Sequence, residues 1–135
     1  MKNRIVVLGL LTIGLAGCEG VTGPSVSSLQ GTWQLVSLQQ AGQAQVSAPG
    51  GATFSAEFGS DGRVSVAADC NRCGSTYQAD RDTLHVGVMA CTLAYCATAP
   101  LDTQFSGLVS AAESWSVANG ELELRSAQGT LRLRR

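Results

Sequence analysis

Apolar and polar residues alternate in short runs along most of the chain after Gly31, and turn-forming residues separate the runs. An alternation with a period of two is typical of β-strands that bury one face of a sheet. Asp61-Gly62 and Asn119-Gly120 lie between such runs, and both dipeptides are typical of tight β-hairpins. The pattern predicts strands at 32–38, 53–58, 63–68, 74–79, 83–88, 115–118, 121–125 and 129–134.

Residues 97–113 depart from this period. Their apolar residues recur at spacings of four, three and four, as on one face of an α-helix: Leu101, Phe105, Leu108 and Ala112. Thr98 is expected to be the N-cap residue, and Pro100 suits the first turn because its missing N–H costs nothing there. The patterns together predict a mainly β (α+β) fold, a strongly curved antiparallel barrel-like sheet of about eight strands with one helix.

The amino terminus has the features of an export signal. Two basic residues precede an apolar run at 5–15, which is too short to span a membrane as a helix. The run ends in Leu15-Ala16-Gly17-Cys18, which resembles the lipobox of bacterial lipoproteins, where cleavage before the cysteine is followed by its acylation. The resemblance implies a lipid anchor on Cys18, which would hold the protein on a membrane without crossing it.

The residue after this cysteine bears on sorting between membranes. In such lipoproteins an Asp directly after the lipidated cysteine retains the protein in the inner membrane. This chain has Glu19 at that position, so we expect the protein to be anchored in the outer membrane, facing the periplasm. The alternative is an ordinary secreted protein whose signal ends in cysteine. The predicted organisation is a signal peptide at 1–17, a lipidated cysteine with a flexible tether at 18–28, and one folded domain at 29–135.

Charge and titratable groups limit the function classes. Nine Lys and Arg stand against ten Asp and Glu, a formal net charge of −1, so the positive charge that neutralises nucleic-acid phosphates is missing. His85 is the only histidine, and on strand 83–88 it faces away from Leu84, Val86 and Val88. General acid–base catalysis needs groups that titrate near neutrality. We therefore expect no enzyme, no cofactor and no nucleic-acid partner.

Four cysteines remain beside Cys18, in two close pairs: Cys70 with Cys73 and Cys91 with Cys96. The spacing is similar to that of a zinc ribbon, but an exported protein reaches an oxidising compartment, which favours two disulfide bridges over a metal site. Four cysteines allow three pairings, which sequence does not separate. Our preferred pairing is Cys70 with Cys91 and Cys73 with Cys96, which ties residues before Tyr77 to the loop after Val88.

The order of several short motifs resembles the META domain family, which includes HslJ-like heat-shock lipoproteins. The motifs are Leu29-Gln30-Gly31-Thr32-Trp33-Gln34-Leu35, Phe58-Gly59-Ser60-Asp61-Gly62-Arg63-Val64, Cys70-Asn71-Arg72, Tyr77 with Asp82-Thr83-Leu84, Met89-Ala90-Cys91, the 101–110 helix, Gly120-Glu121-Leu122-Glu123-Leu124 and Leu131-Arg132-Leu133. The resemblance covers residues 29–135 and implies a β-rich, barrel-like envelope domain linked to stress or antibiotic tolerance. It implies no specific molecular activity.

Two functions are carried forward. The favoured one is a non-enzymatic envelope lipoprotein with an interaction or stress-tolerance role, whose partner is an unknown envelope protein. Asn71 and Arg72 are its candidate interaction site. The alternative role of Asn71 is to support a disulfide-bound turn, since Asn is common in turns. The alternative is a periplasmic binder of small apolar ligands, since Gly31-Thr32-Trp33 resembles the opening of lipocalins. There the Trp packs under a late Arg, a place that Arg132 or Arg134 could fill.

Overall fold

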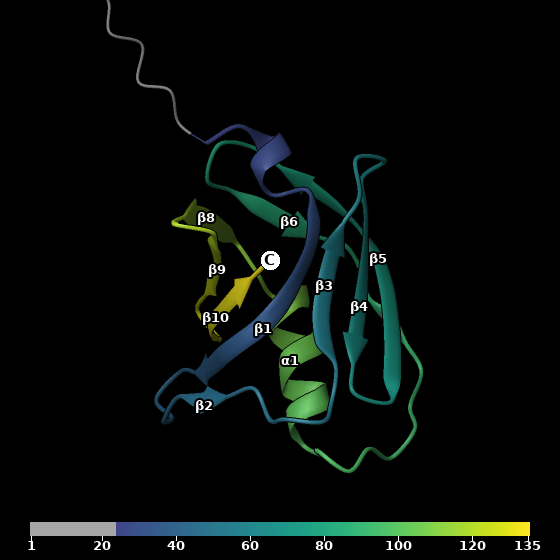
Figure 1. Cartoon of the computed structure of the whole chain (residues 1–135). Helices are drawn as coiled ribbons and strands as arrows, with labels where there is room; N and C mark the ends of the chain where they lie inside the picture. Colours follow the sequence, from purple (N-terminus) through teal and green to yellow (C-terminus); the bar gives the residue numbers. More distant parts are fainter. Residues whose placement is uncertain (1–23) are drawn as a thin grey trace, which may run out of the picture.

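The computed structural model describes residues 24–135 (Figure 1). In chain order its elements are η1 (Val26–Ser28), β1 (Gly31–Gln40), β2 (Val46–Ser47), β3 (Phe54–Phe58), β4 (Arg63–Ala68), β5 (Asn71–Ala79), β6 (Leu84–Val86), β7 (Ala90–Cys91), α1 (Leu101–Ser110), β8 (Ser114–Ala118), β9 (Glu121–Ser126) and β10 (Gly129–Arg134). The predicted signal peptide and Cys18 lie outside the described residues. The last part of the segment expected as a tether, Val26–Ser28, forms a short 3-10 turn.

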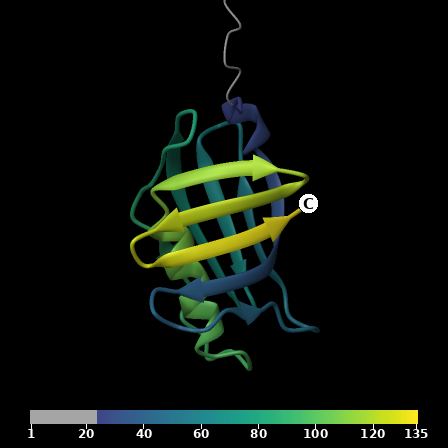
Figure 2. The ribbon, with the colours of Figure 1, turned by 90° about the vertical axis from the view of Figure 1, so that its left-hand side faces the viewer.

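The strands form one strongly curved antiparallel sheet, which Figures 1 and 2 show from two sides. Its order is β6-β5-β4-β3-β1-β10-β9-β8, and β2 and β7 add short pairings to β1 and β5. The two ends of this path meet, because Thr83 bridges Ser114 and the Leu84 N–H donates to the Glu113 carbonyl at 2.9 Å. The expected fold class is therefore confirmed: the fold is a nearly closed, barrel-like sheet with one helix among the described residues.

The predicted strands correspond closely to the eight strands of this path. The bounds of β4 and β10 coincide with the predicted 63–68 and 129–134. The two-residue strands β2 and β7 were not predicted. The prediction that Val88 shares the buried face of Leu84 and Val86 is wrong, because β6 ends at Val86 and the Val88 side chain is 97% exposed.

Helix α1 packs on the concave side of the sheet, in the lower half of the molecule in Figure 1. Phe105 is fully buried and meets the Phe54 ring edge to face, with 5.7 Å between ring centroids. The predicted apolar face of the helix is confirmed at Leu101, Phe105 and Leu108, which are buried; Ala112 is also buried but lies beyond the end of α1 at Ser110. Thr98 does not cap the helix as expected; its hydroxyl donates instead to the Asp69 carboxylate at 2.8 Å, and α1 begins after Pro100 without a side-chain cap.

Trp33 belongs to this core as well. Its indole is fully buried and its Nε1–H donates to the Leu29 carbonyl at 2.7 Å. The guanidinium that covers the ring belongs to Arg135, 4.4 Å from the ring centroid, and not to Arg132 or Arg134 as expected. The side chains of β10 explain the difference. Leu131 and Leu133 point into the core, so Arg132 and Arg134 point outward, and Arg135, just beyond the strand, reaches the indole.

Candidate functional site

Two disulfide bridges hold the segment that follows β6. They join Cys70 to Cys96 and Cys73 to Cys91. The expectation of two bridges is confirmed, but the preferred pairing is wrong. Strand register gives the reason: β7 pairs antiparallel with β5 so that Cys73 and Cys91 lie directly opposite each other, which leaves Cys96 for Cys70.

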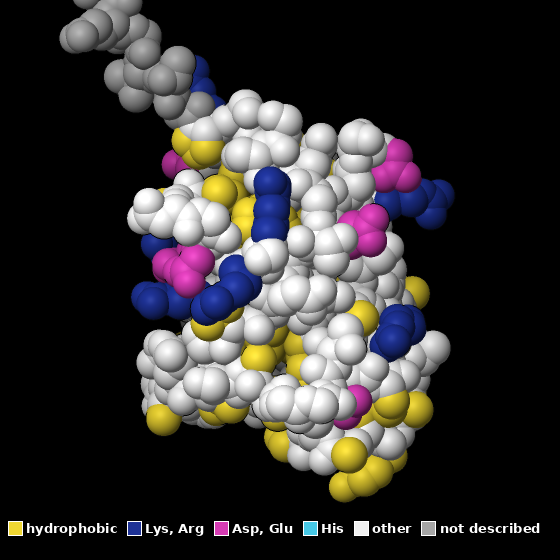
Figure 3. Space-filling view, viewed as in Figure 1, with side chains coloured by type: hydrophobic (Ala, Val, Ile, Leu, Met, Phe, Trp, Pro, Cys, Tyr) yellow, Lys and Arg dark blue, Asp and Glu magenta, His cyan; other side chains and the backbone are white. Residues whose placement is uncertain are grey.

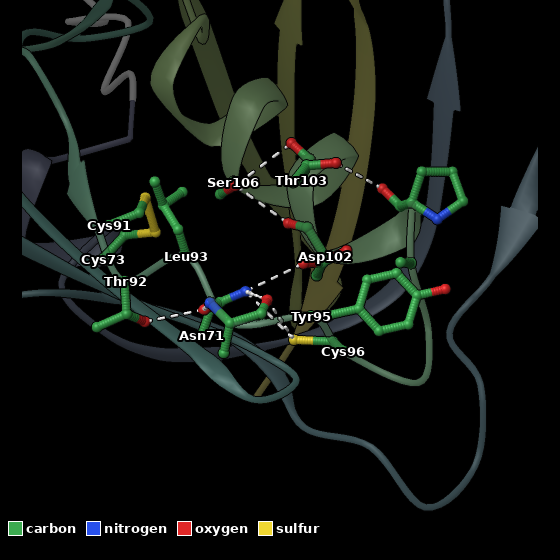
Figure 4. A pocket seen from close by; sticks show the side chains of 13 residues that line it. Asn71, Cys73, Cys91, Thr92, Leu93, Tyr95, Cys96, Asp102, Thr103 and Ser106 are labelled. Atoms are coloured by element: carbon green, nitrogen blue, oxygen red, sulfur yellow. Dashed lines mark hydrogen bonds between the residues drawn. A yellow bond between two sulfur atoms is a disulfide. The ribbon is translucent and has the colours of Figure 1, made fainter.

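Asn71 is the polar centre of this region (Figure 4). Its side chain is 5% exposed, because β5 begins at Asn71 and turns it inward together with Cys73. Its Nδ2 donates to the Ala94 carbonyl at 2.9 Å and to Asp102 Oδ2 at 3.1 Å, with Cys96 Sγ at 3.2 Å. Its Oδ1 accepts from the Ala94 N–H at 2.8 Å and from the Thr92 hydroxyl at 3.0 Å. One amide thus ties β5, the 91–96 loop and α1 together.

Arg72, the second candidate interaction residue, points the other way. It is exposed, and its Nη1 donates to the backbone carbonyls of Asp69 and Asn71 at 2.7 and 2.9 Å. Its own N–H donates to the Thr92 hydroxyl at 2.9 Å. Asn71 and Arg72 therefore lie on opposite faces of β5 and do not form one site, and both support the turn that carries the bridges.

We call residues 91–96 the bridged loop, because a disulfide holds the cysteine at each end. A pocket of about 410 Å³ lies outside the barrel, between this loop and α1 (Figure 4). Its lining is mostly apolar and consists of Asn71, Cys73, Cys91, Thr92, Leu93, Ala94, Tyr95, Cys96, Ala99, Pro100, Asp102, Thr103 and Ser106. Asp102 is the only charged residue among them, and it is 4% exposed. Its Oδ1 is buried and accepts no hydrogen bond from the described residues. The pocket was not predicted, because it forms only when the bridges bring the loop against α1.

The same loop exposes large apolar side chains. Val88, Leu93 and Tyr95 are 97%, 91% and 93% exposed. Residues 86–101 contain no Asp, Glu, Lys, Arg or His, an uninterrupted uncharged stretch that was the sequence signal for this surface. In Figure 3 hydrophobic side chains gather at the lower right of the molecule, over the segment that leads into α1. Leu93 and Tyr95 both line the pocket beside α1, whereas Val88 lies against β4 and β5, where its carbonyl accepts from the Ser75 hydroxyl. Isolated apolar residues are common on surfaces, whereas contiguous exposed apolar patches are typical of interaction surfaces.

The other candidates for chemistry do not come together. His85 is exposed on β6, and Asp80 and Asp82 lie at the turn before it. Glu123 lies on the outer face of β9, where it binds the Arg125 Nε at 2.6 Å. Within residues 24–135, no three His, Cys, Asp or Glu side chains are grouped closely enough to hold a metal ion.

The phenol of Tyr77 is buried, and its surroundings shift its pKa. Burial raises the pKa of its phenol above the usual 10.0, the nearby Asp61 carboxylate raises it further, and a hydrogen bond with Gln30 acts in the opposite direction. The Tyr77 hydroxyl donates to the Gly59 carbonyl at 2.7 Å, and its ring packs edge to face on Phe58. These contacts fix the β3–β4 turn against β5, so Tyr77 has a structural role.

Comparison with known proteins identifies the family. The model of the META domain matches residues 27–135, which is nearly all of the described chain. The chain belongs to the META domain family. This membership confirms the family resemblance and suggests a stress-related or envelope protein. No curated protein sequence matches the chain.

Two solved structures share the META fold of this chain. One is described as the NMR structure of the protein from Burkholderia xenovorans, with a TM-score of 0.64 and 20% identity over 91% of this chain and 98% of that one. The other, described as the NMR structure of the protein, has a TM-score of 0.60 and 19% identity over 78% of this chain and 88% of that one. At these identities the likeness shows the fold alone.

Proposed function

We propose that this META protein is a lipid-anchored envelope protein that binds another envelope protein through the 88–96 loop, supports stress tolerance and has no enzymatic activity. Three features of the sequence support the anchor: the short apolar run, the lipobox-like tetrapeptide and the small polar residues after Cys18. Among the described residues, no helix is both long enough and apolar enough to cross a membrane.

The observation that carries the interaction role is the exposure of Leu93 and Tyr95 on a loop that is held in place. An exposed apolar side chain stabilises nothing in the isolated domain, whereas burial against a partner gains about 25 cal/mol for each Å² removed from water. The bridges and the Asn71 hydrogen bonds fix the loop beforehand. A fixed loop loses little conformational entropy on binding, which supports affinity.

Geometry favours a protein partner over the membrane that carries the anchor. In Figure 1 η1 lies at the top of the barrel, whereas the segment leading into α1 lies at the bottom. A domain tethered beyond η1 therefore presents the loop away from its own anchor. The loop also has no Lys or Arg that would attract anionic lipid headgroups.

The interior of the barrel does not favour the alternative of a lipocalin-like binder. Trp33, Phe105 and Trp115 fill it and are at most 1% exposed, together with the leucines of β9 and β10. A ligand inside the barrel would have to displace this packing. The pocket of about 410 Å³ lies outside the barrel and is considered separately below.

The test of the interaction combines crosslinking with a phenotype in the bacterium that encodes the protein. A photo-crosslinking residue at Leu93 should give one discrete protein adduct, and the same residue at exposed Ala127, in the distant β9–β10 turn, should not. The variant Leu93→Ser/Tyr95→Ser should fold normally, but a bacterium that carries it instead of the wild-type protein should survive heat less well. Equal tolerance of the variant and the wild type would refute the interaction role.

The lipid anchor is tested independently. Metabolic labelling with a palmitate analogue should label the wild-type protein, and Cys18→Ser should abolish the label and release the protein from the membrane fraction. A Cys18→Ser protein that still carries label, or a wild-type protein that carries none, would contradict the anchor. Neither result would affect the conclusion on the loop.

A further inference from the structure

The pocket between the bridged loop and α1 contains one polar group that the protein leaves without a partner. Both atoms of the Asn71 amide are used by Ala94, Thr92 and Asp102. The Thr103 hydroxyl donates to the Pro100 carbonyl at 2.9 Å, and the Ser106 hydroxyl to the Asp102 carbonyl at 3.0 Å. Unlike these groups, Asp102 Oδ1 accepts no hydrogen bond from the described residues.

This orphan oxygen is fixed, since Asn71 Nδ2 holds the other carboxylate oxygen at 3.1 Å and Asp102 lies in the first turn of α1. A buried polar atom without a hydrogen bond is destabilising, and native proteins keep few of them. A carboxylate oxygen is an acceptor only, so whatever satisfies it must be a donor.

We propose that this pocket binds a small organic ammonium, with its N–H groups on Asp102 Oδ1 and its apolar body against the loop. The charge of the lining selects the sign, because Asp102 is the only charged side chain there and no Lys, Arg or His lines the pocket. Leu93, Tyr95 and Pro100 supply apolar surface for the body of the ligand. The volume of about 410 Å³ lies within the range of small-molecule sites.

Access to the carboxylate requires a small movement of the wall. Less than 1 Å² of Oδ1 is exposed, so a donor reaches it only when neighbouring side chains shift. Leu93 and Tyr95 are each more than 90% exposed, so the side chains that must shift are the more deeply buried ones of the lining. This proposal does not rest on the protein partner: its test measures binding of a small molecule to the protein alone, and its variants lie on α1 and leave the partner-test residues Leu93 and Tyr95 unchanged.

The experiment is calorimetric titration of the full-length chain, with both bridges intact, using benzylammonium and cyclohexylammonium as probes. Benzyl alcohol and benzoate are the matched ligands that keep the apolar body and change the charge. Asp102→Asn removes the charge and keeps an oxygen near Asn71. Ser106→Phe fills the pocket, and Ser110→Phe, at another half-buried serine of α1 that does not line it, is the matched control.

We expect saturable binding of the ammonium probes, binding of benzyl alcohol at least about tenfold weaker, and no binding of benzoate. Asp102→Asn should raise the Kd of the ammonium probes at least about tenfold, and Ser106→Phe should do the same while Ser110→Phe changes it less than about twofold. If Asp102→Asn fails to fold, the proposal is still tested by the comparison of the ammonium, alcohol and carboxylate ligands and by the comparison of Ser106→Phe with Ser110→Phe. The proposal is overturned by equal affinities for benzylammonium and benzyl alcohol, by equal effects of the two serine variants, or by no saturable binding up to about 10 mM.

Discussion

Replacing Asn71 with alanine tests whether this residue organises the bridged loop. The change removes the amide that donates to the Ala94 carbonyl and to Asp102 Oδ2, and that accepts from the Ala94 N–H and the Thr92 hydroxyl. Both bridges remain. The loop would therefore stay attached to β5 through its cysteines but lose its polar centre.

The magnitude follows from these four contacts. Three of them are hydrogen bonds between neutral groups, each with a net value of about 1 kcal/mol, reduced where the partner regains water in the exposed loop. The fourth is a bond to a charged group, for which about 1.5–3 kcal/mol is typical. Asp102 is 4% exposed and would then have both oxygens unpartnered. We expect Asn71→Ala to lower the free energy of unfolding by about 3–5 kcal/mol, a large part of the total for a small domain.

The assay is urea unfolding at neutral pH with the disulfides intact, applied to Asn71→Ala, Asp102→Ala and the double variant. Because removal of both partners leaves no orphaned carboxylate, the double variant should lose less than the sum of the single losses, by at least about 1 kcal/mol. A loss below about 1 kcal/mol for Asn71→Ala, or strictly additive losses, would refute the role assigned to Asn71.

Three further predictions concern other parts of the domain. The folded chain should lose stability as the pH rises above 10, because the pKa of Tyr77 is raised by folding and the folded state holds the phenolic proton more tightly; urea midpoints at about pH 9 and about pH 11.5 should differ less in Tyr77→Phe than in the wild type. Arg135→Ala should cost about 1 kcal/mol and change the near-ultraviolet dichroism of Trp33, whereas Arg134→Ala should cost less than about 0.5 kcal/mol; equal effects would contradict the stacking. Removing the Cys73–Cys91 bridge, which spans 18 residues, by serine replacement should cost about 3 kcal/mol in thermal or urea unfolding, and an unchanged midpoint would show that the bridge does not hold the loop.

Period-two patterning was enough to predict the main strands because each of them buries one face. It did not predict β2 and β7, since a two-residue strand has no period to detect. It also extended one strand to Val88, whose place in the alternation agreed with Leu84 and Val86. The chain leaves the sheet at Gly87, and alternation alone does not mark such an exit.

Disulfide pairing could not be predicted because the competing pairings close loops of similar length. Closure entropy varies only with the logarithm of loop length. The preferred pairing would close spans of 21 and 23 residues and the observed pairing closes spans of 26 and 18, so their summed closure entropies differ by less than about 0.1 kcal/mol. Strand register decides the pairing instead. It places Cys91 opposite Cys73, and this register depends on β7, which the sequence pattern did not reveal.

Asn71 and Arg72 were recognised as unusual but were treated as one site. β5 begins three residues before the predicted strand, at Asn71, and the alternation of a strand then sends Asn71 inward and Arg72 outward. The pocket beside Asn71 could not be predicted in the same way. Its walls come from β5, the 91–96 loop and α1, and only the folded chain brings Asp102 into contact with Asn71.

The bridged loop combines features that a merely structural connection does not need. A connection between a sheet and a helix is most soluble when it is polar, yet residues 86–101 are uncharged and three large apolar side chains point into solvent. Two bridges and a buried amide hold the backbone of residues 91–96 in place. Stabilising a loop in this way while leaving its apolar side chains uncovered is consistent with a surface that is buried in a complex. Since the segment that leads into α1 lies at the end of the barrel opposite η1, a partner bound there would not conflict sterically with a tether beyond η1.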